Sequence, residues 1–173
     1  MTFTKTFFST ITALIFALSS ASAFAYDKHE MQTLVMDIEI TGDSSVTGDK
    51  KDNVRKIEKF SEHLRVELQD KTAFSIVDNA EALQAVTKLQ TEENVVNCNG
   101  CEVPLAEKFG AGLVMTPYVF RMSHLISTLH IEVKDVETGI LIKKKAFDFR
   151  GNTDQAWQRA IKYAVRDLKD WRP

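Results

Sequence analysis

Alternating apolar and polar residues mark the β-strands of this chain, because successive side chains of a strand point to opposite faces of a sheet. The first such segment is Gln32 to Ile40, where Leu34 and every second residue after it are apolar. Asp37 and Glu39 then occupy the other face and are expected to be solvated. The predicted strands are Gln32 to Ile40, Phe74 to Val77, Leu113 to Arg121, Leu125 to Asp135 and Ile140 to Phe149.

Other segments place apolar residues three or four positions apart, which is the spacing of an amphipathic helix. In Asn53 to Asp70, apolar residues follow this spacing and are predicted to face the core: Val54, Ile57, Phe60 or Ser61, Leu64 and Leu68. Residues that typically begin or end helices predict three more helices. One follows Asp78 and Asn79, one extends from Pro104 to Phe109 before Gly110, and one extends from Asp154 to Leu168.

The predicted elements follow the order β-α-β-α-α-β-β-β-α, which indicates a single α/β domain. Helices would pack on a mixed sheet. Its last strands would form an antiparallel meander, because Glu137 to Gly139 makes a tight turn between two of them. Pro117 lacks an amide hydrogen, so we expect its strand to lie at an edge of the sheet or to meet a bulge there.

The first 25 residues, Met1 to Ala25, form a separate unit. Lys5 is their only charged residue, an apolar run extends from Phe7 to Leu18, and small residues stand at the −3 and −1 positions before a cleavage site after Ala25. This pattern is typical of a secretory signal peptide, and the run is shorter than the roughly 20 residues that span a bilayer. The alternative is a buried N-terminal helix. We expect cleavage near Ala25, a periplasmic location and one domain over residues 26–173.

Composition excludes several classes of partner. The chain has 22 basic and 24 acidic residues, and one basic residue lies in the signal segment, so the remainder carries a net charge of −3. This balance gives no electrostatic reason to expect binding to nucleic acid or to an anionic membrane. Because Cys98 is the first cysteine, a lipid anchor at the cleaved N-terminus is not expected, and the cleaved protein is predicted to be soluble.

Cys98 and Cys101 are the only cysteines, and they form a C-x-x-C motif whose Asn99 and Gly100 can supply a tight turn. In an exported protein, a structural disulfide is the default for such a pair. Two alternatives remain open. The first is thiol–disulfide exchange with Cys98 as the nucleophile, and the second is metal ligation, for which a tetrahedral zinc site would need two further ligands.

No other pattern indicates catalysis, a metal site or a cofactor. The four histidines lack metal-ligand spacing, and His63 and His130 are expected to be solvated; no nucleophile elbow or glycine-rich phosphate loop is present. Lys143 to Lys145 lie in a predicted strand and are expected to be solvated and to protect a sheet edge. We therefore expect a protein that is not an enzyme and that has no cofactor.

The densest group of specialised side chains comprises Arg150, Asn152, Asp154 and Trp157. One interpretation is structural: Thr153 or Asp154 caps the last helix and Trp157 packs in the core. The other is that Arg150, Asn152 and Asp154 form a polar cluster that binds a protein partner, with Trp157 beside them. Both interpretations remain open at the level of sequence.

Several segments of the chain carry a resemblance to a known family: LVMDIEI (Leu34 to Ile40), FSIVDN (Phe74 to Asn79), LAEKFGAGLVMTPYV (Leu105 to Val119) and IEVKDVETGILI (Ile131 to Ile142). They resemble the strands, the helix and the Asp-x-x-Thr-Gly turn of the family that contains the N-terminal domain of TolB and the curli-secretion lipoprotein. With RGNTDQAW (Arg150 to Trp157) included, the chain beyond the signal segment is similar to a proteobacterial family of exported proteins of unknown function.

This resemblance implies a non-enzymatic envelope domain that binds other proteins. The chain lacks the propeller of TolB and the lipidation cysteine and pore-forming strands of the curli protein, so a secretion channel is not implied. The sequence thus predicts a periplasmic accessory or protein-interaction domain with an envelope protein as partner. The alternatives from other classes are a thiol–disulfide oxidoreductase that uses the C-x-x-C pair and a carrier of a small molecule or metal.

Overall fold

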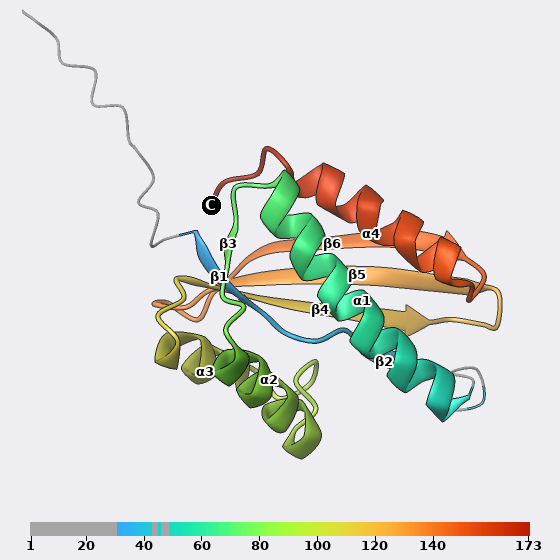
Figure 1. Ribbon diagram of the computed structural model, residues 1–173, viewed down its shortest axis with the longest axis horizontal. Helices are drawn as coiled ribbons and strands as arrows, with labels where there is room; N and C mark the ends of the chain where they lie inside the picture. The colour runs from blue at the N-terminus through green and yellow to red at the C-terminus, as the bar shows by residue number, and fades with distance from the viewer. Residues whose placement is uncertain (1–30, 43–44, 46–48) are drawn as a thin grey trace, which may run out of the picture.

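A computed structural model describes residues 31–42, 45 and 49–173. The predicted signal peptide, Met1 to Ala25, lies outside the described residues. The elements of the described part are β1 (Gln32–Val35), β2 (Glu39–Gly42), α1 (Lys50–Lys71), β3 (Ser75–Ile76), α2 (Ala80–Glu92), α3 (Glu102–Lys108), β4 (Leu113–Arg121), β5 (Ile126–Asp135), β6 (Leu141–Arg150) and α4 (Asp154–Leu168) (Figure 1).

These strands form one mixed sheet in the order β3-β1-β4-β5-β6, with β2 paired to β4 beyond the end of β1. The pairs among β1, β2, β3 and β4 are parallel, whereas β4, β5 and β6 are antiparallel. The predicted fold class, a mixed α/β sheet with a C-terminal antiparallel meander, is confirmed. The chief difference is that the first predicted strand is divided into β1 and β2.

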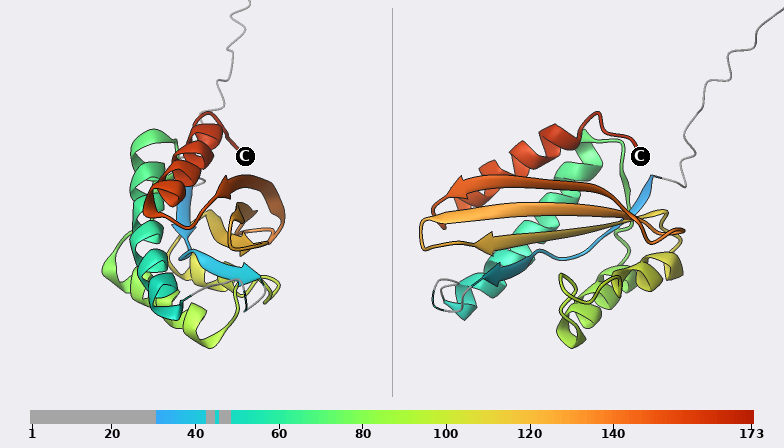
Figure 2. Two further views of the ribbon diagram at one scale, coloured as in Figure 1. Left: turned by 90° about the vertical axis from the view of Figure 1, so that its right-hand side faces the viewer. Right: turned by 180° about the vertical axis from the view of Figure 1, so that it is seen from behind.

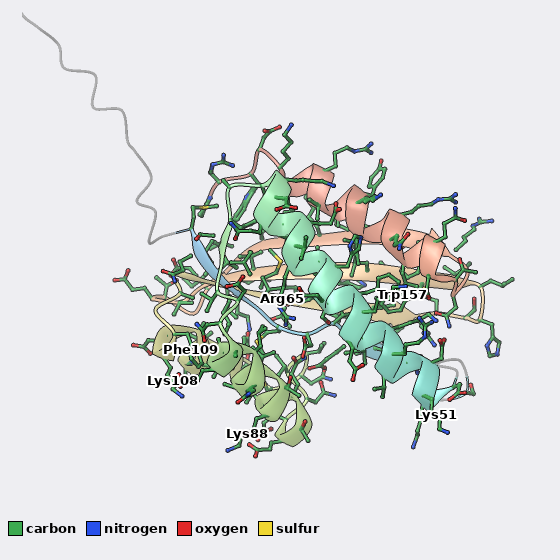
Figure 3. All side chains as sticks on the ribbon, in the orientation of Figure 1. Lys51, Arg65, Lys88, Lys108, Phe109 and Trp157 are labelled. Carbon is green, nitrogen blue, oxygen red and sulfur yellow. A yellow bond between two sulfur atoms is a disulfide. The ribbon has the colours of Figure 1, made fainter. Side chains whose placement is uncertain are left out.

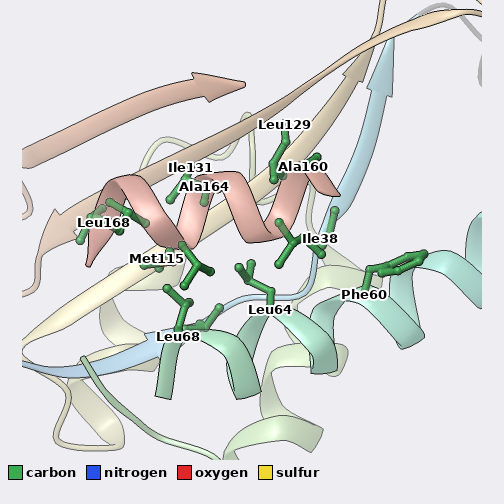
Figure 4. Close-up of a cluster of buried hydrophobic side chains, with 14 of the residues drawn as sticks. Ile38, Phe60, Leu64, Leu68, Met115, Leu129, Ile131, Ala160, Ala164 and Leu168 are labelled. Atoms are coloured by element: carbon green, nitrogen blue, oxygen red, sulfur yellow. The ribbon is translucent and has the colours of Figure 1, made fainter. Parts of the chain in front are cut away.

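Helices cover the sheet unequally. α1 and α4 lie together on one face, and the left view of Figure 2 shows them on the same side of the strands. Their apolar side chains pack against β4 and β5 in the main core, which includes Phe60, Leu64, Leu68, Met115, Leu129, Ile131, Ala164 and Leu168 (Figure 4). Full burial of one such leucine or isoleucine stabilises the fold by about 1.5–3 kcal/mol. α2 and α3 cover a smaller area of the opposite face with a second core, which includes Leu34, Met36, Val86, Ala106 and Val114.

A bulge separates β1 from β2. Val35 is paired with Met115 and Glu39 with Tyr118, so the first strand uses one more residue than β4 over the same distance. An extra residue reverses the face to which the following side chains point. Consequently Met36 belongs to the core under α2 and α3, whereas Ile38 belongs to the core under α1 and α4. The prediction that Leu34, Met36, Ile38 and Ile40 share one face is therefore wrong.

Side chains from both faces stabilise this bulge. Ser61 of α1 accepts a hydrogen bond from the Ile38 amide at 2.8 Å. Arg65 of α1, labelled in Figure 3, donates to the Val35 carbonyl at 3.0 Å. From the other face, Gln90 of α2 accepts from the Asp37 amide at 2.9 Å. The polar backbone groups that a broken ladder exposes are thus satisfied by both helices.

The same contacts correct two predictions about β1 and β2. Asp37 is not simply solvated, because one of its carboxylate oxygens accepts from Arg65 at 2.6 Å. Glu39 accepts hydrogen bonds from the Gln90 amide group at 3.0 Å and from the Val95 amide at 3.1 Å. For Pro117, the second of the two expected alternatives is confirmed. Its strand is central, and Pro117 stands opposite the bulge, where β4 needs no amide donor from it.

The predicted inner face of α1 is confirmed except near its N-terminus. Leu64 and Leu68 are buried as expected, but Val54 is 56% exposed. Two charged residues of α1, Lys56 and Arg65, are buried as well.

None of the helices in the described part of the chain has the length and apolar character needed to cross a membrane.

Candidate functional site

The predicted recognition residues lie where the β4–β5 hairpin meets the corner between β6 and α4. The Gly151 amide donates to the Leu125 carbonyl at 2.9 Å, which holds this corner against the hairpin. The Asn152 side-chain oxygen accepts from Arg121 at 3.0 Å and from the Trp157 indole nitrogen at 3.1 Å. Asn152 therefore connects the end of β4 to the first turn of α4.

Asp154 is held by basic residues of α1. Its two carboxylate oxygens accept from Arg55 at 2.9 and 3.0 Å, and Lys59 donates to it at 2.6 Å. Hydrogen bonds from Arg55 and Lys59 lower the pKa of Asp154 well below its ordinary range. The carboxylate thus stays ionised and joins α4 to α1.

Three of the four predicted residues consequently have internal partners. Thr153 caps α4 by accepting from the Ala156 amide, and Trp157 is buried between the aromatic rings of Phe60 and Phe149. Arg150 is exposed, and among the described residues its side chain has no hydrogen-bond or ion-pair partner. The structural interpretation of this helix start is supported, and the role of these residues in partner binding stays a prediction.

Arg121, at the end of β4, is a feature that the sequence analysis missed. It is only 4% exposed, and its Nε atom has no hydrogen-bond partner in the described part of the chain. Burial lowers the pKa of its guanidinium, while the Asp52 carboxylate opposes this effect. The only sequence feature that could have indicated a buried Arg121 is its position as a charged residue at the end of a strand of mostly apolar residues.

The β4–β5 hairpin beside this corner exposes large apolar side chains. Met122 is 62% exposed and Leu125 is 71% exposed, and Phe120 and Ile126 are exposed next to them. Ile126 is paired directly with Arg150 of β6. We call these five residues, Phe120, Met122, Leu125, Ile126 and Arg150, the distal surface.

Cys98 and Cys101 form a disulfide at the start of α3, with an S–S distance of 2.02 Å. Between them Asn99 has a φ of 56° and Gly100 a φ of 108°, so these two residues make the turn that the motif requires. Both sulfur-bearing side chains pack against the core under α2 and α3. The predicted disulfide is present.

A buried carboxylate lies beside the disulfide. Glu102 is 1% exposed, and its Oε2 atom is 3.7 Å from Cys98 Sγ. Its other oxygen accepts from Lys134 of β5 at 2.5 Å, which compensates its charge. In the described residues, Cys98, Cys101 and Glu102 are the one group whose ligand atoms converge as a metal site would require, but the disulfide occupies both sulfurs.

The face of the meander that no helix covers carries polar and aromatic pairs. His130 stacks on Tyr118 with ring centroids 4.5 Å apart, so it is half-buried rather than solvated as predicted. Burial and the nearby Lys144 lower the pKa of His130, while burial and Glu132 raise that of Tyr118. Lys144 forms an ion pair with Glu132 at 2.7 Å. A cavity of about 360 Å³ lies between this face and the Cys98–Cys101 turn.

The geometry combines an exposed apolar hairpin with a half-buried disulfide turn. The sequence over residues 32–168 matches the DUF3280 family, described as "Protein of unknown function (DUF2380)", and the chain belongs to this family. Among curated proteins, no sequence matches the chain.

Several solved structures share the fold at low sequence identity. The LpoB C-terminal domain from Salmonella enterica aligns with a TM-score of 0.52 and 16% identity over 68% of this chain and 80% of that one. PelC from Paraburkholderia phytofirmans, described as a dodecamer, aligns with a TM-score of 0.52 and 11% identity over 83% and 91% of the two chains. Lipoprotein GNA1162 from Neisseria meningitidis aligns with a TM-score of 0.50 and 13% identity over 79% and 94%.

Proposed function

We propose that this protein is a periplasmic accessory domain that binds an envelope protein through the distal surface. The observation that carries the proposal is the exposure of Met122 and Leu125 together with Phe120 and Ile126 on one hairpin. Apolar side chains that gather on an exposed surface are typical of protein–protein contact sites. Arg150 adds a charged residue at the rim, where interfaces are commonly polar.

The rigid base of this hairpin favours a binding role. Asn152 connects Arg121 to Trp157, and Asp154 connects α4 to α1, so the residues next to the distal surface are held in place by hydrogen bonds. A surface that is ordered before binding loses less conformational entropy when a partner docks. In this proposal the predicted cluster supports the interface, and Arg150 contacts the partner.

The proposed location rests on the sequence and on the disulfide. Disulfides persist in oxidising compartments such as the periplasm, and Cys98–Cys101 agrees with the predicted signal peptide at Met1 to Ala25. One structural neighbour is described as a lipoprotein, which supports an envelope role by analogy of fold. The finer resemblance to the TolB N-terminal domain and the curli-secretion lipoprotein stays a prediction.

Site-specific photo-crosslinking in cells that naturally express the protein tests this proposal. A photoreactive residue at Leu125 or Met122 is expected to give a discrete crosslinked protein, whereas the same residue at Lys88 on α2 is expected to give none. The proposal fails if neither distal position yields an adduct beyond that of the Lys88 control.

A second candidate function, thiol–disulfide exchange, has one specific observation in its favour. Glu102 is buried beside Cys98 and could accept or return a proton when an external thiolate attacks the disulfide. The test is the equilibrium of the protein with a glutathione redox buffer. A reduction potential below about −300 mV would mark a structural bond and exclude this role, whereas a higher potential would support it.

A further inference from the structure

The outer edge of β6 is the longest unpaired strand edge of the sheet. β6 is the last strand in the sheet order, and none of the described strands pairs with its outer side. It runs for ten residues from Leu141 to Arg150, and Lys144, Ala146 and Asp148 along it are exposed. An exposed edge presents backbone amides and carbonyls that can pair with an added strand.

A groove lies along this edge on the side of the helices. It has a volume of about 400 Å³ and is formed by β6 residues Ala146 to Phe149 and by Arg159, Ala160 and Tyr163 of α4. The Tyr163 ring meets Phe147 edge to face at 6.2 Å, which gives the groove an aromatic wall. An apolar side chain of an added strand would fit here, next to the Arg159 guanidinium.

The charge around the edge is strongly positive. β6 and α4 together contain seven lysines and arginines and three aspartates, although the whole chain has a formal charge of −2. The nearby acidic groups already have partners: Asp167 pairs with Lys145, Glu132 of β5 with Lys144, and Asp154 with Arg55 of α1. Asp148 accepts a hydrogen bond from Thr128, and Lys143, Arg159 and Lys162 remain in excess. This excess attracts an acidic segment and opposes a second copy, which would bring the same charges.

We propose that the β6 edge and the α4 groove bind an acidic, extended segment of a protein partner as an added β-strand. This inference rests on the proposed role in protein binding, but it concerns a different surface and a defined partner chemistry. Its backbone would pair with β6. On the helix side, one apolar side chain would occupy the groove and acidic side chains two positions from it would face Lys143, Lys145 and Arg159; on the other side, an acidic side chain would face Lys144.

The direct test uses a fluorescent synthetic peptide of roughly six residues, the usual length of a strand, with one central valine and glutamate at every other position. In a strand of this sequence, glutamates lie on the same face as the valine as well as on the opposite face. It is expected to bind the purified protein, with an affinity that falls as the salt concentration rises. Hydrogen exchange measured by NMR is expected to slow at alternate amides of β6. Exchange that slows elsewhere, or binding that is equally tight for a matched peptide with lysine in place of glutamate, would overturn the inference.

Variants of the exposed Arg159 sharpen the test without touching the core. Arg159→Gln is expected to weaken binding, and Arg159→Glu to weaken it roughly fivefold or more. Lys88→Glu, an equal charge reversal on α2 across the sheet, is the matched control and is expected to have no effect (Figure 3). Equal losses for Arg159→Glu and Lys88→Glu would contradict a local site, as would a dimer formed through β6.

The distal surface provides the comparison that separates the two proposals. Leu125→Ser is expected to leave the affinity for the acidic peptide unchanged. If the peptide fails to bind while Leu125 still crosslinks to a partner, the inference is wrong and the proposed function stands. If the peptide binds β6 while the distal positions give no adduct, the inference stands and the distal surface is not the interface.

Discussion

Asp154 and Arg55 are joined by two hydrogen bonds, with Nη1 3.0 Å from Oδ2 and Nη2 2.9 Å from Oδ1. They are 99 positions apart in the sequence, so the contact ties the start of α4 to the start of α1. Asp154→Asn removes the negative charge but keeps the size of the side chain. We expect a lower free energy of unfolding at neutral pH than in the parent protein.

The pH dependence of this difference follows from the lowered pKa of Asp154. A depressed folded-state pKa stabilises the protein above the unfolded value of 3.8, and this stabilisation is lost progressively as the pH falls below it. Urea denaturation at several pH values should therefore show the difference shrink in acid. Glu62→Gln, on the exposed side of α1, serves as the control; an equal effect there would contradict a specific role for Asp154.

Trp157 is expected to be a major source of stability, because it is buried and stacks on Phe60 with centroids 5.2 Å apart. Trp157→Ala should lower the free energy of unfolding by about 3–5 kcal/mol. Val54→Ala, at an exposed position of α1, should change it by less than about 0.5 kcal/mol. Chemical denaturation measures both, and similar small losses would show that the core around Trp157 is loosely packed.

Buried Glu102 forms an ion pair with half-buried Lys134, which a double-mutant cycle can test. Lys134→Met leaves the Glu102 carboxylate buried without its cation and should cost about 3–5 kcal/mol. Adding Glu102→Gln should recover much of this loss, because the buried charge is then gone. If the two changes destabilise the protein additively, the pair does not interact as the 2.5 Å distance indicates.

The disulfide closes a very small ring, so its effect should be modest and local. Replacing Cys98 and Cys101 by serine is expected to lower the free energy of unfolding by about 2 kcal/mol. Hydrogen exchange should become faster in α3 and the preceding loop and remain unchanged in α4. A loss of the whole fold on reduction would contradict this prediction.

His130 should make stability depend on pH near neutrality. Its folded-state pKa is lowered from 6.5 by burial and by Lys144, against the smaller opposing effects of Glu132 and Asp148. The unfolded chain then binds a proton that the folded chain resists, so stability is highest above about pH 6.5 and decreases as the pH falls through the folded pKa.

His130→Phe should flatten this dependence while preserving a stack on Tyr118. His130 Nδ1 has no hydrogen-bond partner among the described residues, so the replacement removes no bond from that atom. The measurement is urea denaturation between about pH 5 and pH 8, the range in which histidine titrates. An unchanged slope would mean that other groups cause the pH dependence.

The fold was largely predictable because the spacing of apolar residues and the positions of helix-capping and turn residues agreed along most of the chain. α4 begins at Asp154 and ends at Leu168, as its apolar spacing indicated, and Gly110 ends the short helix before β4 with a φ of 69°. The bulge was not predictable. Both faces of β1 are covered by helices, so Leu34 and Val35 are each buried and alternation no longer distinguishes the faces.

The candidate site was only partly predictable for a different reason. Asn152, Asp154 and Trp157 are close in the sequence and were placed at the start of one helix. However, Arg55, the partner of Asp154, and Arg121, the partner of Asn152, come from distant parts of the chain. A local motif cannot show which long-range cation will neutralise a carboxylate. The exposure of Leu125 was likewise not predictable, because this apolar residue continues the alternation of the strand predicted from Leu125 to Asp135.

The bulge between β1 and β2 also connects helices on the two faces of the sheet. Residues 36–38 are held by Ser61 from one side of the sheet and by Gln90 from the other. A displacement of α2 therefore pulls on the same short stretch of backbone that anchors α1. Two neighbouring amides of this short segment, those of Asp37 and Ile38, thus connect two helices that lie on opposite faces of the sheet.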